Sequence, residues 1–373
     1  MTKPRRPLTL AHVTGETGFS GGELQVFLLL EGLRKRGHHS VLLCPPGSRS
    51  QQEAARRGIE VRPVRTGNEW SLRSMWEMRR ELRASAPDLV HLHTGRANWL
   101  GGLAAWNLGL PALTTRRMDR AVKRNARTRF MYSRVVRRAV AISGAVRARM
   151  IEGGVPPAMI RVITSAVDPQ ALYPQLGRTA TRAQAGLASQ AALLLVVAAL
   201  VHRKGIDVLL DALARLADDG LRPALWIAGQ GPARPALEKQ ARELGLDHQV
   251  RFLGERSDIP DLLAACDVFI LPSRHEGLGV AALEAMAAAR PIVATRVGGL
   301  AEAVVDERTG LLIPPSDPAA LAGALTRLLR DPALRARLAA QGPSRVAEGF
   351  GADHLVDAYE GLYFEVLGEV ARS

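Results

Sequence analysis

The chain has 373 residues, which is more than one hydrophobic core usually fills and suits two domains. Its 47% hydrophobic and 23% charged residues fit a soluble globular protein, and its longest apolar run, Ala191 to Val201, is too short for a membrane span of roughly 18–20 residues. With 50 Lys and Arg against 36 Asp and Glu, the net charge of +14 favours nucleotides, nucleic acid or an anionic membrane surface as partners, unless it reflects a GC-rich genome.

Short apolar segments alternate with helical segments up to about residue 164. Strands are predicted at residues 8–13, 41–44, 59–64, 88–92, 111–115, 139–142 and 160–164. Helices are predicted at residues 23–36, 51–57, 71–85, 97–108 and 144–153. The first helix has a capping box, Ser20 and Glu23, at its start and Gly37 at its end. This alternation indicates a parallel sheet with helices on both faces.

A second series with the same alternation begins near residue 192. Its strands are predicted at residues 192–199, 224–228, 250–253, 267–271, 291–295 and 311–314. Its helices are predicted at residues 205–219, 232–245, 258–265, 278–289, 317–330, 332–347 and 352–370. We therefore predict an α/β protein with two Rossmann-like β/α/β domains, residues 1–168 and 191–350, and a C-terminal helix in residues 351–373. The Pro-, Gly- and Thr-containing residues 169–190 are predicted to be a linker, and a cleft between the domains is the usual ligand site.

The loop after the first strand is rich in glycine, with Gly15, Gly18, Gly21 and Gly22. Because its spacing differs from G-x-G-x-x-G, the loop indicates a nicotinamide-type dinucleotide only weakly. Backbone amides at the start of the following helix suit an anion or a sugar hydroxyl. A tight turn without a ligand is the alternative.

Two histidines, His91 and His93, stand at the end of the strand predicted at residues 88–92. His93 is the better placed of the two to reach the cleft. For His91, a hydrogen-bonded core or surface histidine is the favoured interpretation.

Residues 116–138 carry a cluster of positive charge in which Asp119 is the one acidic residue. The basic residues are Arg116, Arg117, Arg120, Lys123, Arg124, Arg127, Arg129, Arg134, Arg137 and Arg138. Apolar residues interleave with them, as in basic amphipathic helices that lie on anionic membranes. A solvated helix face is the alternative. Nucleic acid is not expected as a partner, because no nucleic-acid motif accompanies the charge.

Arg203 and Lys204 open the first helix of the second domain. Two cations there oppose the helix macrodipole, which makes sense if they face a bound diphosphate. Exposed basic side chains without a ligand are the alternative. The glycine turns at Gly229 and at Gly298-Gly299 offer backbone amides that suit phosphate in the same way.

Two carboxylates, Glu276 and Glu284, bracket a glycine-rich turn after the strand at residues 267–271. The carboxyl end of a parallel strand is where open α/β sheets bind ligands. Glu284 lies on an otherwise apolar helix, so we expect it to be buried or to face a ligand. Accepting hydrogen bonds from the paired hydroxyls of a ribose or hexose is one natural role.

The two cysteines, Cys44 and Cys266, are far apart and lie in or beside apolar runs. Buried thiols in a reducing compartment are therefore favoured over a disulfide. The apolar segment at residues 8–13 is too short for the core of a signal peptide. We expect a cytoplasmic protein, and a peripheral position on the inner face of the membrane stays open.

As an ordered set, these segments resemble the family-4 retaining glycosyltransferases, which have the GT-B fold, in particular those of the bacterial cell envelope and of lipopolysaccharide synthesis. In the second domain the matching segments are Lys204-Gly205, Ile227–Pro232, Val250–Gly254, Asp267–Ser273, Glu276-x7-Glu284, Pro291–Thr295, Val297–Glu302 and Thr309–Pro314. The first domain matches more thinly, at Ser20–Gly22, Asp88–His93 and Val140–Ser143.

The resemblance implies two domains that face each other across a cleft, a last helix that returns to the first domain, and a nucleoside-diphosphate sugar as donor. By this resemblance, Glu284 would hold the ribose hydroxyls, and Glu276 and His93 would contact the transferred sugar. Lys204 would neutralise the diphosphate. The donor set implied or suggested by the motifs is Arg203, Lys204, Gly229, Gly277, Leu278, Gly279, Val280, Glu284, Gly298 and Gly299.

On the acceptor side of the cleft, the candidates are Gly21, Gly22, Arg116 and Arg117. The two arginines replace a histidine that is common in the family. Ala198-Ala199 stands where the family has Gly-Arg, and Arg203 is expected to substitute for the missing arginine. The family's Asn-Gly is Ser165-Ala166 here.

We therefore expect a retaining hexosyltransferase that acts on an acceptor hydroxyl, with a lipid-linked or lipopolysaccharide glycan suggested by the basic segment. Neither cleft-facing region contains an Asp-x-Asp motif, so no metal or other cofactor is expected. Two alternatives stay open. One is another GT-B enzyme, a nucleotide-sugar 2-epimerase or a phosphorylase, and the other is a non-catalytic sugar-nucleotide-binding protein.

Overall fold

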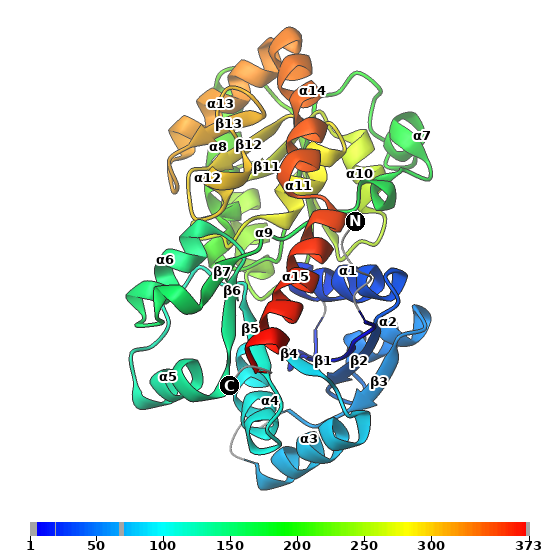
Figure 1. Cartoon of the computed structure of the whole chain (residues 1–373). Coiled ribbons are helices and arrows are strands. Elements are labelled where there is room, and N and C mark those ends of the chain that lie inside the picture. Colours follow the sequence, from blue (N-terminus) through cyan, green and yellow to red (C-terminus); the bar gives the residue numbers. More distant parts are fainter. Residues whose placement is uncertain (1–5, 19, 67–70, 371–373) are drawn as a thin grey trace. The chain divides into compact units, whose positions relative to one another are not determined.

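The computed structural model describes residues 6–18, 20–66 and 71–370 (Figure 1). Contacts within the chain divide it into two compact units. The first consists of Met1–Ser165 with Ala352–Ser373, and the second of Ala166–Gly351. Each unit contains its own parallel sheet with helices, which confirms the predicted α/β class.

Seven parallel strands, counted over the described residues, form the sheet of the first unit in the order β3-β2-β1-β4-β5-β6-β7. Their bounds are β1 Thr9–Val13, β2 His39–Cys44, β3 Glu60–Pro63, β4 Leu89–Leu92, β5 Ala112–Arg116, β6 Arg138–Ala141 and β7 Ile160–Val162. The central strands are almost entirely buried, as expected for strands covered on both faces. In the register of β1 and β4, His12 lies opposite His91.

Helices of the first unit follow the predicted positions. They are α1 Gly21–Lys35, α2 Arg49–Arg56, α3 Leu72–Ser85, α4 Gly95–Asn107 and α6 Gly144–Glu152, and the 3₁₀ turn η2 Pro157–Met159 was not predicted. The predicted capping box of Ser20 and Glu23 is present at the start of α1. The C-terminal helix α15, Ala352–Val370, runs beside α1, where a Cβ added to Gly32 would stand 2.3 Å from Val356 (Figure 1). The predicted return of this helix to the first domain is confirmed.

The basic segment 116–138 is not the single helix that its sequence suggested. Its helical part comprises α5, Ala126–Phe130, and a π-helical turn, η1, Met131–Val135, while its two ends belong to β5 and β6. Several cations are engaged within the unit. The guanidinium of Arg124 donates to a backbone carbonyl of α6, and that of Arg138 pairs with two glutamates of α15. Contacts with α6 and α15 therefore determine the structure of this segment more than its amphipathic pattern does.

Six parallel strands of the described chain form the second sheet in the order β10-β9-β8-β11-β12-β13. Their bounds are β8 Leu193–Val197, β9 Ala224–Ala228, β10 Val250–Gly254, β11 Val268–Leu271, β12 Ile292–Thr295 and β13 Gly310–Ile313. The helices are η4 His202–Lys204, α8 Ile206–Asp218, α9 Arg234–Glu243, α10 Ile259–Ala265, α11 Val280–Ala287, α12 Leu300–Ala303, α13 Pro318–Arg330 and α14 Pro332–Gly349. Every predicted strand of both sheets is present, with its ends within two residues of the prediction.

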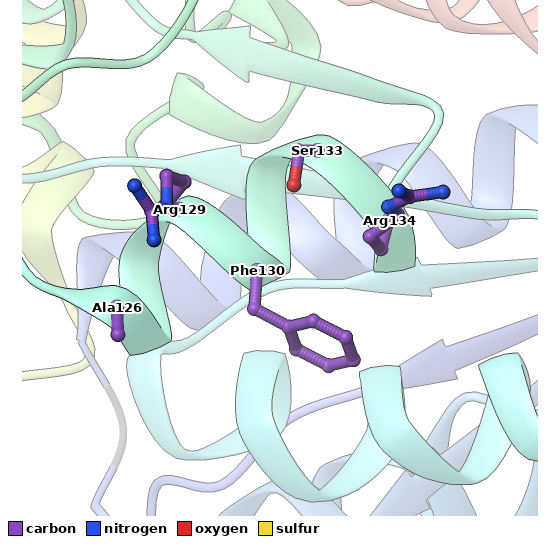
Figure 2. A pocket seen from close by; sticks show the side chains of 5 residues that line it. All are labelled: Ala126, Arg129, Phe130, Ser133 and Arg134. Atoms are coloured by element: carbon purple, nitrogen blue, oxygen red, sulfur yellow. The ribbon is translucent and has the colours of Figure 1, made fainter.

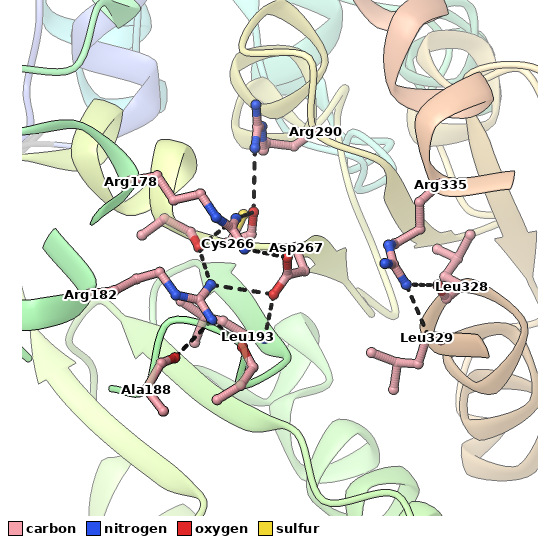
Figure 3. Close-up of polar contacts among 12 residues, drawn as sticks. Arg178, Arg182, Ala188, Leu193, Cys266, Asp267, Arg290, Leu328, Leu329 and Arg335 are labelled. Carbon is pink, nitrogen blue, oxygen red and sulfur yellow. Dashed lines mark hydrogen bonds and ion pairs between the residues drawn. The ribbon is translucent and has the colours of Figure 1, made fainter. Parts of the chain in front are cut away.

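The predicted linker is a packed part of the second unit. Residues 169–190 form η3, Pro169–Leu172, and α7, Gly177–Gln184, and α7 packs against α10. Arg182 of α7 is only 2% exposed and donates to the carbonyl of Ala265, while Arg178 pairs with Asp267 at 2.7 Å (Figure 3). Residues 169–190 look like a linker in the sequence because residues that hold them in place lie more than 80 positions away in the chain.

Both cysteines, Cys44 and Cys266, are buried free thiols, as predicted. Burial raises the pKa of Cys266 to about 12 and that of Cys44 above its usual value, so both stay protonated near neutral pH. None of the described helices combines the length and the apolar character needed to cross a bilayer.

Candidate active site

Two neighbouring loops of the second unit carry Arg203, Lys204 and residues 277–279 of the predicted donor set. Strands β8 and β11 are parallel neighbours, so the turn after β8 and the loop after β11 leave the same edge of the sheet. The backbone amide of Arg274 donates to the carbonyl of Arg203 at 2.8 Å, which joins the two loops. Gly205 is required at the junction, because its φ is +66° and an added Cβ would stand 2.0 Å from the carbonyl oxygen of Pro272.

Arg274 fixes the same junction through its side chain. Its guanidinium donates to the carbonyl of His202 at 2.9 Å and forms a bidentate pair with Asp207, at 2.7 and 2.6 Å. Burial raises the pKa of the Asp207 carboxyl, but the bonds from Arg274 outweigh this effect and hold the pKa below its ordinary value. The turn that carries Lys204 is therefore held in place by charged and backbone contacts.

Within these loops, Lys204 forms an ion pair with Glu276. The Glu276 oxygen that faces the ammonium also accepts a hydrogen bond from Ser273 Oγ at 3.2 Å. Both side chains of the pair are largely buried, with exposed fractions of 12% and 11%. Both were predicted as site residues, but the sequence did not indicate that they contact each other.

Glu284 lies on α11 as a half-buried carboxylate that accepts no hydrogen bond from any described residue. Burial raises its pKa to about 7. Hydroxyl groups that donate hydrogen bonds to this carboxylate would stabilise its ionised form. The expectation that it is buried or faces a ligand is consistent with this environment.

The backbone around the start of α11 offers free amides. Gly279, with φ +88°, precedes the helix, and no side chain caps it. Close packing requires glycine here, because a Cβ on Gly279 would stand 2.4 Å from Leu300. The amides of Leu278, Gly279 and Val280 donate to no described residue, so they are available to an anion.

Two other predicted glycine amides are already engaged. Gly229 donates to the carbonyl of Gly254 at 2.6 Å, and Gly299 donates to the carbonyl of Glu276 at 3.2 Å. Their role is therefore to allow close approach of backbones: a Cβ on Gly229 would stand 1.9 Å from the Ala198 oxygen. The side chain of Arg203 is exposed.

The first unit holds a cluster of three buried histidines. His12 Nδ1 lies 3.0 Å from His93 Nε2, and the rings of His91 and His93 are 3.9 Å apart. His91 is hydrogen-bonded to Tyr363 of α15 at 2.8 Å and to Thr115 of β5 at 2.7 Å. Burial lowers the pKa of His12 to about 3 and lowers those of His91 and His93 as well, so the rings are neutral.

His91 is thus the hydrogen-bonded core histidine that was favoured from sequence. His93 is buried as well, at 4% exposure, and its Nδ1 has no partner among the described residues. His12 was missed, although a histidine inside the apolar run Leu8–Val13 was the available signal. Ligand atoms of the three rings lie within 4.8 Å of one another, but four of their six nitrogens are engaged in the hydrogen bonds above.

Arg117 lies beside the start of α1. A Cβ on Gly22 would stand 3.4 Å from Arg117 Cδ, while the Gly22 amide donates to Ser20 Oγ at 3.2 Å. Burial lowers the pKa of Arg117, and nearby Tyr359 and Glu23 partly oppose this shift. Its buried Nε has no partner among the described residues, and Gly21 is the first residue of the helix. The structure therefore brings Gly22 and Arg117 of the predicted acceptor set together.

An open groove of about 570 Å³ runs along α5 and η1. Figure 2 shows Arg129 and Arg134 at its two ends, with Phe130 between them. The Phe130 ring meets Trp106 edge to face, with centroids 5.4 Å apart. In this groove, arginines of the basic segment lie beside an aromatic side chain.

Both units match models of known protein families. Residues 177–345 match the family model described as "Glycosyl transferases group 1", and residues 19–171 match the model described as "Glycosyltransferase Family 4". A D-inositol 3-phosphate glycosyltransferase of Thermomonospora curvata is 36% identical over 308 residues, which are 74% of this chain and 71% of that protein. The corresponding protein of Streptomyces bingchenggensis is 32% identical over 305 residues, 75% of this chain and 67% of that protein.

Other relatives are matched over less of their length. The lipopolysaccharide core biosynthesis glycosyltransferase LpsE of Rhizobium meliloti is 36% identical over 48% of this chain and 51% of that protein. Among solved structures, Anabaena HepE in complex with UDP and glucose has a TM-score of 0.84 at 21% identity, over 95% of this chain and 99% of that one. WaaG, described as involved in lipopolysaccharide biosynthesis, has a TM-score of 0.72 at 20% identity, over 94% and 98%. These structures share the fold of this chain.

Proposed function

The chain belongs to the family-4 glycosyltransferases, and from this membership we propose that it transfers a hexose-type sugar from a nucleoside-diphosphate sugar to an acceptor hydroxyl. One observation carries the proposal: the loops after β8 and β11 and the helix α11 that follows them carry a largely buried cation, a carboxylate and helix amides, of which the carboxylate and the amides bond to no described residue. A nucleoside diphosphate needs these three kinds of group. HepE, which has a similar fold, is described with UDP and with UDP-glucose.

In the proposed donor complex, Glu284 accepts hydrogen bonds from the two ribose hydroxyls. Lys204 and the amides of Leu278, Gly279 and Val280 take the diphosphate, because an ammonium and a helix N-terminus both favour negative charge. The Lys204 ammonium has three N–H donors. It donates one hydrogen bond to Glu276, so the remaining donors can bind phosphate. Gly298 and the exposed Arg203 are assigned to the same end of the donor.

The reaction we propose retains the anomeric configuration. The bond between the anomeric carbon and the diphosphate oxygen breaks through an oxocarbenium-like transition state, and the acceptor oxygen attacks from the same face. The leaving phosphate oxygen takes the acceptor proton. Charge grows on the diphosphate as this bond breaks, so Lys204 and the helix amides act by electrostatic stabilisation. Because these groups balance the charge, we propose that transfer needs no metal.

Glu276 is assigned to the transferred sugar. Its ion pair with Lys204 and its bond from Ser273 restrict the carboxylate to one orientation, which is what a sugar-positioning group requires. We assign His93 to the same sugar, because its ring is neutral and its Nδ1 bonds to no described residue.

For the acceptor, we propose a lipid-linked or lipopolysaccharide glycan used by a cytoplasmic enzyme at the inner membrane surface. The lipopolysaccharide relative LpsE and the groove with Arg129, Phe130 and Arg134 support this proposal. Flotation with anionic liposomes tests the membrane contact: we expect binding that weakens with salt and with the double substitution R129A/R134A. Absence of binding at low salt would exclude it.

The transfer itself is tested with a panel of nucleotide sugars and glycan acceptors. Release of nucleoside diphosphate identifies the donor, and proton NMR of the product gives the anomeric configuration. We expect release with one donor class and a product of retained configuration, with or without a chelator. Absence of release with every donor, or an inverted product, would contradict the proposal.

A further inference from the structure

A cavity of about 140 Å³ lies in the first unit at the end of β5, beside the start of α4. Residues from α4, from β5 and from 122–136 line it, and none of these described lining residues is acidic. Its polar side chains include Asn98, Thr114, Arg116 and Tyr132. The cavity therefore has a positive charge in its wall and lacks an opposite charge.

Three of these side chains have unused hydrogen-bond donors. Tyr132 is only 7% exposed, yet its hydroxyl bonds to no described residue. Arg116 uses one nitrogen for the carbonyl of Arg120, while its buried Nε has no partner among the described residues. The Asn98 oxygen accepts from Thr114 Oγ1 at 2.6 Å, which leaves the Asn98 amide group as a donor without a described partner.

The unpaired donor of Arg116 is costly unless something binds. Its Nε is buried and has no partner among the described residues, and such a group costs about 1–3 kcal/mol, more when it is charged. Burial lowers the pKa of Arg116, with a smaller opposing effect from Tyr132, and burial raises the pKa of Tyr132, so at neutral pH the phenol is a donor beside a cation. An anion with several acceptor oxygens would satisfy all three groups together.

The size of the cavity suits a small anion. A water molecule needs only about 10–15 Å³ of the kind of space measured here, so a cavity of about 140 Å³ has room for a group of several heavy atoms. Trp99, with the guanidinium of Arg127 4.1 Å from its ring centre, also lines the cavity. A phosphate or carboxylate group therefore fits this space.

We propose that this cavity binds a compact oxyanion, a phosphate or a carboxylate, held by Arg116, Tyr132 and Asn98. The acceptor that carries such a group, or free inorganic phosphate, would supply it. Its use in acceptor selection rests on the proposed function, whereas the binding itself does not.

Binding is tested by isothermal titration of the full chain with inorganic phosphate and with acetate. We compare the wild type with Arg116→Gln, Tyr132→Phe and the control Arg120→Gln, which removes an exposed charge from the same segment. Circular dichroism confirms that each variant is folded. We expect 1:1 phosphate binding that weakens at least tenfold in Arg116→Gln and about threefold in Tyr132→Phe, with less than a twofold change in Arg120→Gln. No binding to the wild type, or equal loss in Arg116→Gln and Arg120→Gln, would overturn the proposal.

A kinetic arm distinguishes the two sources of the oxyanion. Once the panel above has identified the acceptor, phosphate is tested as an inhibitor of the transfer reaction. If phosphate competes with the acceptor in the wild type but not in Arg116→Gln, the oxyanion is a group that the acceptor carries. Phosphate that changes kcat without competing, and only when Arg116 is present, indicates a free ligand. Phosphate that acts equally on both proteins contradicts the site. If no donor is cleaved at all, the proposed function fails, while the titration still decides whether the site exists.

Discussion

Lys204 and Glu276 stand 72 positions apart in the chain and meet as an ion pair whose carboxylate is also bonded by Ser273. The cation assigned to the diphosphate thus orients the carboxylate assigned to the sugar. Substitutions at the two positions should separate these roles, because only one of the two residues is proposed to contact phosphate.

We predict that Lys204→Met weakens binding of UDP, or of the diphosphate of whichever donor is used, roughly 10- to 100-fold, which corresponds to a charge-assisted hydrogen bond of about 1.5–3 kcal/mol. Glu276→Gln should leave diphosphate binding within about threefold and lower kcat at least about 100-fold. Titration calorimetry and steady-state kinetics measure the two effects. Lys239→Met, a charge change at an exposed side chain of the same unit, is the matched control. Unchanged diphosphate affinity in Lys204→Met would show that the cation does not face phosphate.

Glu284 provides a prediction about pH. Since its carboxyl has a pKa of about 7 in the free protein, donor binding that needs the ionised form should strengthen as pH rises from 6 to 8. Glu284→Gln should bind donor more weakly, with an affinity independent of pH over this range. A wild-type donor Kd that does not vary between pH 6 and 8 would argue against the ribose contact.

The same carboxyl affects stability. Its pKa is higher in the folded chain, about 7, than in the unfolded chain, about 4.5, so the folded state binds more protons between these values. The contribution of this carboxyl to the free energy of unfolding is therefore fully present below pH 4.5 and is lost as pH rises towards 7. The loss is at most about 3 kcal/mol, and it is smaller than this limit because the side chain is partly exposed. We expect Glu284→Gln to be more stable than the wild type in urea at pH 8 and similar to it near pH 4.5. A pH-independent difference would contradict this.

Gly205 and Gly220 form a matched pair for testing the junction of the two loops. Both have positive φ, +66° and +77°. A Cβ at Gly205 would meet the Pro272 oxygen, while no atom of the described residues lies within 4 Å of a Cβ at Gly220. Alanine should cost about 1 kcal/mol at either site for the backbone conformation, and about 1–3 kcal/mol more at Gly205 for the overlap. Gly205→Ala should also lower kcat/KM, since the turn carries Lys204. Equal unfolding free energies for the two variants would refute the close approach.

Both sheets could be predicted from the sequence because most of their strands are short apolar runs that alternate with helical segments. Glu284 was recognisable for a similar reason, as one charge on an apolar helix. These signals are local, and so they survive in a single sequence.

Features that depend on distant partners could not be predicted in this way. The three histidines come together only because β1 and β4 are neighbours in the sheet, and His91 is then fixed by Tyr363, 272 positions away. The same holds for the engaged amides of Gly229 and Gly299, which sequence alone assigned to phosphate.

Arg182 shows how such a partner turns a linker-like segment into core. Its guanidinium donates to the Ala265 carbonyl at 2.8 Å and pairs with Asp267 at 3.4 Å, at a side chain that is almost fully buried. We predict that Arg182→Leu costs about 3–5 kcal/mol in urea unfolding, because it removes the buried cation that pairs with Asp267 and donates to the Ala265 and Ala191 carbonyls. Arg178→Leu, which removes a 41% exposed partner of the same carboxylate, should cost less than about 1 kcal/mol. Hydrogen exchange should become faster in α7 and at the Leu193 amide, which bonds to the same Asp267. If Arg182→Leu and Arg178→Leu had equal unfolding free energies, the contacts of Arg182 would not stabilise the second unit. Residues 169–190 would then be a linker, as their sequence suggested.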